Sequence, residues 1–324
     1  MDDSLPILVA DIGGTNARFA LARRGSAARP ELADILQVAT AEYPSLKDAA
    51  EAYLQRCGGP RPQRAVLAVA SAVTGDAIKI TNNPWAFSIR ELGADLGLSL
   101  DVINDFTAMA LVLPVLEAGD LLAIGEVPMR EPFDARRSYA VVGPGTGLGV
   151  GGVIVEQGRG IVIQSEGGHV GFSPGTPYEL ELLRVLQPRF GRVSAERLIS
   201  GTGLVNLHDA VRAVEGLDAA PLTPEQISEQ AAADADGVCA RTLQVFAELL
   251  GAFAGDVALA FGAWDGVFLP GGVTQKLLPW IAAGGFRRRF DDKGRHGAIL
   301  RKIPTQVITH PQAGLLGTAV QACS

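Results

Sequence analysis

The sequence predicts a mixed α/β chain built from two related lobes, and three observations lead to this fold class. The chain has 324 residues, a length that favours two lobes over one. A strand, a glycine-rich turn and a returning strand occur near the N-terminus and again around residue 145, which indicates a duplicated architecture. The later part of the chain carries apolar residues at helical spacing. A chance recurrence of a glycine hairpin is the alternative to duplication.

The first strand–turn–strand unit opens the chain. Apolar residues over 7–10 lead into a turn at 11–16, and 17–22 returns as a strand. In the second unit, strands over 139–142 and 150–155 flank a glycine-rich turn at 143–149. The other predicted elements are strands over 65–70, 100–103 and 266–269, and helices over 106–116, 195–214, 224–235, 236–262, from 274 and within 308–322. Thr223-Pro224 and Asp234 are predicted helix caps.

Composition and charge exclude several classes of protein. The net charge of −7 and the pI near 5.2 disfavour binding to nucleic acid or to an anionic membrane. The three cysteines are far apart and form neither a disulfide framework nor a zinc-finger spacing. The N-terminus lacks the basic region of a signal peptide, and the apolar stretch 249–264 is too short to span a bilayer. We therefore expect a soluble cytoplasmic protein. The basic segment 286–301 is expected to be a solvated face.

The two glycine-rich turns are candidate phosphate sites, because backbone N–H groups converge where no Cβ obstructs them. The residues concerned are Gly13, Gly14, Thr15 and Asn16 in the first turn and Gly145 and Thr146 in the second. Asp11 ends the strand before the first turn, where a carboxylate can hold Mg²⁺ through water. Ordinary hairpin turns are the alternative. Neither turn matches a Walker A loop or a Rossmann fingerprint.

Asn104-Asp105 lies where a strand ends and a helix begins. An Asp at that position can be no more than a helix N-cap, worth ~1 kcal/mol. It can also be the general base that accepts a proton from an attacking substrate hydroxyl, with Asn104 bound to a neighbouring hydroxyl. The position alone leaves both interpretations open.

Glu166-Gly167-Gly168-His169 places an acid and a histidine on one tight turn. Such a pair suits the hydroxyl groups of a sugar. A surface turn with a capping histidine is one alternative, and a zinc site is disfavoured because further His or Cys ligands are lacking. Taken alone, Glu196 is interpreted as a glutamate in the first turn of the helix predicted over 195–214, where the helix dipole favours an acid. Gly271-Gly272 follows a buried strand, where a flat adenine ring can pack against backbone, although an ordinary strand-to-helix turn reads equally well.

Taken together and in this order, the motifs resemble the bacterial-type glucokinase family of the hexokinase/actin/heat-shock ATPase superfamily. The resemblance rests on 10–18, 103–106, 143–149, 166–171, 195–204, 269–273 and 310–317. It implies a two-lobed actin/hexokinase-like fold, a duplicated ribonuclease H-like architecture with an interlobe cleft. The small lobe is expected at 1–108 plus 307–324 and the large lobe at 109–306. The lobes would close over the sugar and exclude water.

The resemblance also implies an activity and a set of site residues. The expected reaction is ATP- and Mg²⁺-dependent phosphorylation of glucose, in a homodimer, and no zinc is expected because the cysteine-rich motif of a neighbouring branch is lacking. Asp105 matches the catalytic base, and Asn104, Glu166, His169 and Glu196 match residues that bind sugar hydroxyls. The two turns match phosphate-binding loops, Asp11 the residue near Mg²⁺, and Gly271-Gly272 the adenosine site.

Three other functions stay open on the sequence. The first is a kinase of the same fold acting on fructose, mannose or an N-acetylhexosamine. The second is a sugar-sensing regulator, which usually carries a DNA-binding module. The third is a conformational ATPase, which would have no need of Asn104-Asp105 or of the Glu166–His169 turn.

Overall fold

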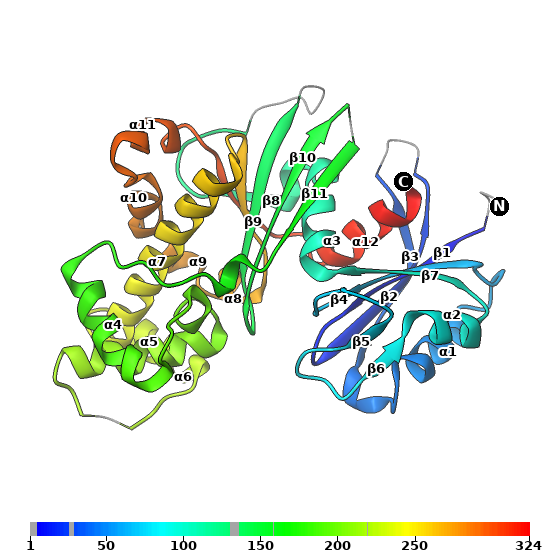
Figure 1. Ribbon diagram of the computed structural model, residues 1–324, viewed down its shortest axis with the longest axis horizontal. Coiled ribbons are helices and arrows are strands. Elements are labelled where there is room, and N and C mark those ends of the chain that lie inside the picture. The colour runs from blue at the N-terminus through cyan, green and yellow to red at the C-terminus, as the bar shows by residue number, and fades with distance from the viewer. Residues whose placement is uncertain (1–4, 26–28, 130–135, 158, 219) are drawn as a thin grey trace. The chain divides into compact units, whose positions relative to one another are not determined.

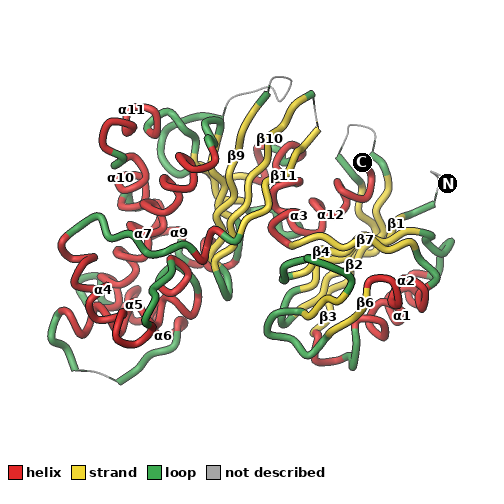
Figure 2. The backbone as a smooth tube through the Cα atoms, viewed as in Figure 1, coloured by secondary structure: helices red, strands yellow, loops and turns green. Residues whose placement is uncertain are grey.

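The computed structural model describes residues 5–25, 29–129, 136–157, 159–218 and 220–324. The chain divides into two compact units (Figure 1). The first comprises Met1–Glu117 together with His310–Ser324, and the second comprises Ala118–Thr309. Each unit contains its own large β-sheet with helices packed on it (Figure 2).

The sheet of the first unit has five strands in the order β3-β2-β1-β4-β7. The strands are β1 (Ile7–Ile12), β2 (Asn16–Arg23), β3 (Glu31–Ala39), β4 (Arg64–Val69) and β7 (Ser99–Asn104). β1, β2 and β3 are antiparallel neighbours, whereas β1, β4 and β7 run parallel. Ile12 pairs with Val69, and Val69 pairs with Asn104. The carboxyl ends of the three parallel strands therefore lie side by side at one edge.

Helices cover both faces of this sheet (Figure 1). They are α1 (Leu46–Cys57), α2 (Ile89–Leu96), α3 (Asp105–Leu111) and α12 (Ala313–Cys323), with a small hairpin of β5 (Ala77–Lys79) and β6 (Ala86–Ser88). Alternate residues of β1, such as Leu8 and Ala10, share a buried cluster with Tyr53 of α1 and Leu92 of α2. α3 and α12 pack against each other on the opposite face.

The sheet of the second unit repeats the topology of the first. Its order is β11-β10-β9-β12-β13-β8, in which β9, β10 and β11 are antiparallel and β9, β12 and β13 are parallel. The strands are β9 (Arg137–Pro144), β10 (Leu148–Glu156), β11 (Arg159–Ser165), β12 (Gly266–Leu269), β13 (Thr305–Ile308) and the added edge strand β8 (Leu121–Ala123). The shared strand order confirms the mixed α/β fold class and makes duplication, not chance recurrence, the better explanation of the two glycine turns.

The second unit is rich in helices, and α7 is its centre. The helices are α4 (Pro177–Phe190), α5 (Gly201–Val214), α6 (Pro224–Ala233), α7 (Val238–Phe261), α8 (Gly272–Lys276), α9 (Leu278–Ala282), α10 (Gly285–Asp291) and α11 (Gly297–Leu300). α7 is long and apolar enough to cross a membrane, but 67% of its most apolar window is buried inside the protein. Most of its residues contribute to the hydrophobic core, as expected of a core helix.

Helix boundaries differ from the prediction at several places, and the helix predicted over 106–116 ends at Leu111 before a 3₁₀ turn at Leu113–Val115. The helix predicted over 195–214 is interrupted, because a 3₁₀ turn at Ala195–Arg197 is followed by a new start at Gly201, where the Ser200 side chain accepts the Gly203 N–H. Thr223 caps α6 in a capping box, as predicted, but Asp234 is the C-cap of that helix and Gly237 is the N-cap of α7.

The basic segment 286–301 is only partly a solvated face. Arg289 forms a buried ion pair with Glu179 at 2.7 Å, and Lys293 pairs with Asp256 at 2.8 Å. Arg287 donates to the carbonyl groups of Leu300 and Ile303. These cations hold the helices of the second unit together, so the expectation of a purely solvated face is wrong.

The contact of α12 with α3 provides a test of the first unit. A Cβ at Gly317 would overlap the carbonyl oxygen of Ala108. Gly317→Ala should therefore lower the free energy of unfolding by about 1–3 kcal/mol despite the better helix propensity of alanine. Thermal unfolding measures the change. Gly75→Ala is the control, because its added Cβ meets nothing within 4 Å. An equal melting temperature for both variants would contradict the packing.

Candidate active site

The polar residues of the first unit gather at the carboxyl edge of its parallel strands. Asp11 precedes the end of β1, Asn104 ends β7, and Asp105 opens α3. Asn104 is the N-cap of α3: its Oδ1 accepts the Phe106 N–H at 2.9 Å, while its Nδ2 donates to the Ser71 carbonyl at 3.2 Å. The Asp105 carboxylate also accepts the Phe106 N–H at 2.9 Å. Since Asn104 already supplies the cap, Asp105 is not needed for capping alone.

The pKa of the Asp105 carboxyl group is shifted toward neutral pH. Burial raises its pKa to about 7, and the nearby negative charge of Asp11 acts in the same direction. Hydrogen bonding to the Phe106 N–H partly opposes the rise. A general base works best when its pKa lies near the working pH. Asp105 therefore has the electrostatic character of a base that takes a proton near neutrality.

Asp11 lies partly buried at the same edge, against α12. Burial raises the pKa of its carboxyl group, and Arg18, at 3.4 Å, opposes that rise. Helix α12 passes over it at Gly314, where a Cβ would come within 2.7 Å of the carboxylate. The described residues contain no group of three or more His, Cys, Asp or Glu side chains that could hold a metal. One carboxylate beside a phosphate-binding turn nevertheless fits Mg²⁺ carried by a nucleotide, because this ion keeps several waters.

The turn between β1 and β2 has its carbonyl groups tied back to the protein. The Thr40 hydroxyl lies 3.1 Å from the carbonyl oxygens of both Gly14 and Thr15, and the Thr40 N–H donates to Thr15 at 2.9 Å. The Asn83 side chain donates to the Gly14 carbonyl at 3.1 Å. In a trans peptide the C=O and the following N–H point in opposite directions. The Thr15 N–H therefore points away from these anchors, and within the described chain no acceptor takes it.

The turn between β9 and β10 also has a carbonyl group held by a hydrogen bond from a distant residue. The Gly201 N–H donates to the Gly145 carbonyl at 2.7 Å, so the N–H of Thr146 points the opposite way. Gly145 itself donates to the Gly147 carbonyl at 2.8 Å, which closes the turn. Each turn thus presents a threonine N–H with a hydroxyl beside it, a donor set suited to a phosphate oxygen.

Gly271 and Gly272 lie next to the second turn, at the carboxyl edge of the parallel pair β9–β12. Gly271 has φ 102°, a conformation that favours glycine, and a Cβ there would approach the Pro144 carbonyl to 3.0 Å. No side chain of either residue obstructs this edge, so a flat ring can approach the backbone.

Glu166, His169 and Glu196 lie together in the second unit. His169 Nε2 is 3.9 Å from Glu166 Oε2, and His169 Nδ1 is 3.8 Å from Glu196 Oε1. The segment after His169 pairs with the one before Glu196, because the Ala195 N–H donates to the Val170 carbonyl at 2.9 Å. The tight turn requires glycine at 168, where a Cβ would overlap the Leu148 carbonyl oxygen. Glu196 lies in the 3₁₀ turn before α5, not in the first turn of a long helix.

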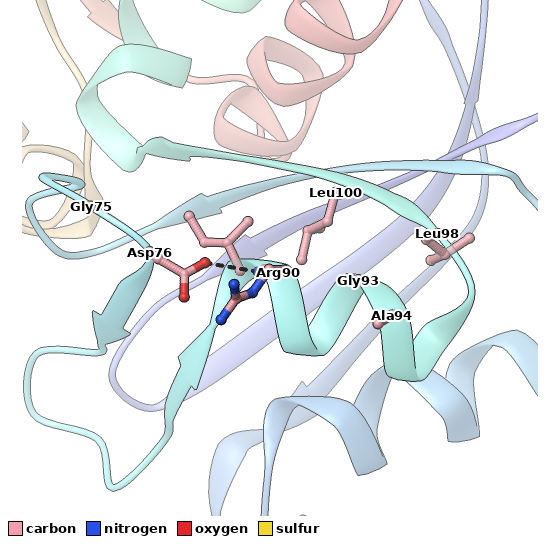
Figure 3. Close-up of a pocket in the computed structure, with 8 residues that line it drawn as sticks. Gly75, Asp76, Arg90, Gly93, Ala94, Leu98 and Leu100 are labelled. Atoms are coloured by element: carbon pink, nitrogen blue, oxygen red, sulfur yellow. Dashed lines mark hydrogen bonds between the residues drawn. The ribbon is translucent and has the colours of Figure 1, made fainter.

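Neither of two pockets, one in each unit, is lined by the acids of these groups. Figure 3 shows a pocket of about 300 Å³ in the first unit, at α2, where the Asp76 carboxylate accepts the Arg90 N–H. It holds none of the predicted site residues. A larger pocket of about 580 Å³ lies in the second unit, next to the turn at 166–169, which we call the sugar-type turn. It lies between Val170 and the α7 residues Phe253 and Phe261.

The structure thus assembles the predicted residues into one group in each unit. The first group is Asp11, Asn104 and Asp105 with the turn Gly13, Gly14, Thr15 and Asn16. The second is Glu166, His169 and Glu196 with Gly145, Thr146, Gly271 and Gly272. Sequence reasoning missed Thr40 and Asn83, which hold the first turn. Asn83 precedes Pro84, a recognised turn signal, whereas nothing local marks Thr40.

Two sheets of one topology, each with a glycine turn between its first two strands, define the actin/hexokinase-like class of phosphotransferases and ATPases. Comparison with known proteins narrows this class. The family described as Glucokinase matches residues 8–324. The chain belongs to the glucokinase family, as its motifs predict.

Individual relatives agree with that assignment. A curated glucokinase of Xanthomonas euvesicatoria pv. vesicatoria is 48% identical over 322 residues, which cover 98% of this chain and 95% of the relative. A glucokinase of Xylella fastidiosa is 47% identical with the same coverage. The crystal structure of a glucokinase from an Antarctic psychrotroph has a TM-score of 0.88 and 36% identity, covering 98% of each chain.

The pKa of Asp105 leads to a pH prediction. Because a general base must be ionised, kcat/KM should fall below about pH 7 as this group takes up a proton. Folding raises the pKa from its ordinary value of 3.8, so between pH 3.8 and about 7 the folded chain binds more protons than the unfolded chain. Stability should therefore decrease as pH rises through this window.

Asp105→Asn separates these effects. The variant should lose turnover by about 10²-fold or more while its melting temperature becomes less dependent on pH in that window. Steady-state rates and thermal unfolding across pH provide the two measurements. A variant with near-normal turnover would remove Asp105 from the base role.

Thr40→Val tests the anchoring of the first turn. Losing the hydroxyl leaves the Gly14 carbonyl held by Asn83 alone and the Thr15 carbonyl by the Thr40 N–H alone. The KM for ATP should rise roughly tenfold, equivalent to about 1.4 kcal/mol, with little change in the KM for the sugar. Thr318→Val is a matched control, because it also removes a buried hydroxyl that donates to a carbonyl, that of Gly314. An equal change in the KM for ATP in both variants would show that the loss reflects stability alone.

Proposed function

We propose that this protein transfers the γ-phosphoryl group of ATP to glucose and forms glucose 6-phosphate. The observation that carries the proposal is the Asp105 carboxyl group, whose pKa near 7 suits a base, at the strand edge that also holds a phosphate-type turn. Membership of the glucokinase family and the name shared by relatives at 47–48% identity support glucose as the acceptor.

The residues of the first unit would perform the proton transfer. Asp105 takes the proton of the attacking sugar hydroxyl, and Asn104 is available to a neighbouring hydroxyl once its Oδ1 has capped α3. When bound, Mg²⁺·ATP supplies the phosphoryl group and neutralises its charge. Asp11 would hold the ion through water, and the Thr15 and Thr146 N–H groups would bind phosphate oxygens.

The residues of the second unit would recognise the sugar and the nucleoside. Glu166 and Glu196 offer carboxylate oxygens to sugar hydroxyls, and His169 lies between them within 4 Å of each. Gly271 and Gly272 leave the backbone open to the adenosine. These assignments rest on the geometry within each unit together with the motif resemblance.

The wider expectations belong to the same proposal. The two compact units serve as the two lobes of the enzyme, with α3 counted in the first unit because it packs against α12. The enzyme acts in the cytoplasm, in glycolysis, as a homodimer and without zinc. The net charge of −7 gives it no attraction to nucleic acid or an anionic membrane.

A kinase for another hexose is the second candidate, because carboxylate pairs bind vicinal hydroxyls in several sugars. The test is the purified protein with Mg²⁺·ATP and, separately, glucose, fructose, mannose or N-acetylglucosamine, with ADP release as the readout. We expect release to depend on sugar and to be fastest with glucose.

Two outcomes would change the proposal. A preference for another sugar would correct the acceptor and keep the mechanism. ADP release at the same rate without sugar would mean a conformational ATPase. Asp105→Asn is the control in each reaction, since a contaminating kinase would be unaffected by it.

A further inference from the structure

One carboxylate in the second unit faces both loops of the proposed site. Glu196 Oε2 accepts the Leu148 N–H at 3.0 Å, at the end of the phosphate-type turn. Glu196 Oε1 lies 3.8 Å from His169 Nδ1, on the sugar-type turn. The side chain is only 27% exposed. Its position is therefore set from two sides, and a shift of either loop would move it.

The segment that carries Glu196 is tied to both loops through its backbone as well. The Gly201 N–H donates to the Gly145 carbonyl, and the Thr202 hydroxyl reaches the Thr146 carbonyl at 3.5 Å. On the other side, the Ala195 N–H donates to the Val170 carbonyl. The turn at 145–148 and the turn at 166–169 are thus joined through residues 195–202.

Gly147 and Gly145 lie in the same turn, but only Gly147 lies against the Glu196 carboxylate, so variants at the two positions can test the contact between Glu196 and the turn. A Cβ at Gly147 would come within 2.5 Å of Glu196 Oε2, and the atom that must yield is the end of a flexible side chain. A Cβ at Gly145 would meet nothing within 4 Å. An alanine at 147 should therefore displace the carboxylate without breaking the fold, whereas an alanine at 145 should leave it in place.

We propose that the turn at 145–148 positions Glu196 for the sugar, and that sugar and nucleotide bind with positive coupling through the Leu148 N–H···Glu196 hydrogen bond. The inference rests on the proposed function. Whichever ligand binds first holds this hydrogen bond in the geometry that the other ligand needs, so the second ligand meets a site that is already arranged. Linkage requires each ligand to strengthen the other by the same factor, typically about 5–150-fold.

Glucose binding to the full chain, measured by calorimetry without nucleotide, is the first test. Gly147→Ala should weaken glucose binding about tenfold, because its carboxylate is displaced. Gly145→Ala, in the same turn, should lose clearly less glucose affinity than Gly147→Ala, because its Cβ meets nothing within 4 Å and leaves Glu196 in place. Equal glucose affinity in wild type and Gly147→Ala, or equal losses in both variants, would overturn the proposal.

The second test repeats the titration with a saturating non-hydrolysable Mg²⁺·ATP analogue. The analogue should tighten glucose binding at least about fivefold in the wild type and much less in Gly147→Ala. Glu196→Gln can still accept the Leu148 N–H, so it should bind glucose more weakly yet keep the coupling factor. A wild-type factor of one, or an unchanged factor in Gly147→Ala, would refute the coupling.

The outcomes separate this proposal from the proposed function. A wild type that binds glucose and releases ADP with it, but shows no effect at Gly147, would refute the coupling alone. A wild type that neither binds glucose nor needs it for ADP release would refute the kinase assignment itself, and the coupling with it.

Discussion

The parallel pairing of β1, β4 and β7 is the constraint on which the chemistry of the first unit depends. It aligns Ile12, Val69 and Asn104 across three strands, so that the glycine turn, the Ser71 carbonyl and the start of α3 meet at one edge. Side chains alternate along a strand, and a slip of one residue would move Asp11 from the α12 face into the apolar face packed by α1 and α2. The tightly packed cluster around Leu8, Ala10 and Ile12 excludes that slip.

Both glycine turns present their N–H groups because residues distant in sequence hold the turn carbonyl groups by hydrogen bonds. In the first unit, Thr40 and Asn83 hold the carbonyl groups of the turn; in the second, the N–H of Gly201 does so. A flexible glycine turn alone would sample many orientations at an entropic cost. Fixing the carbonyl side directs the donors before any ligand arrives, which is the condition for strong electrostatic stabilisation.

Much of the site could be predicted because its signals are local. The two strand–glycine–strand units and the acid that follows Asn104 are contiguous in sequence and are found at the ends of the strands expected to carry them. β3 and β11 were not predicted, since both are edge strands with mostly exposed residues and lack clear apolar alternation. The interruption of the 195–214 helix depends on the Ser200 cap, and the role of Thr40 depends on contacts 25–26 residues away. Neither the burial of Arg289 nor its pairing with Glu179, 110 residues distant, has any local signature.

The first unit is discontinuous, since α12 is supplied by the last residues of the chain. α12 covers β1 and β4 and packs closely on α3, while the second unit is one uninterrupted stretch from Ala118 to Thr309. During synthesis the N-terminal sheet leaves the ribosome first but lacks the helix that closes one of its faces. The second unit, which precedes α12 in the chain, can complete its core before α12 is available. The N-terminal sheet must wait, with an apolar face exposed, until α12 has been made, and this interval is when nascent-chain chaperones would have a surface to bind.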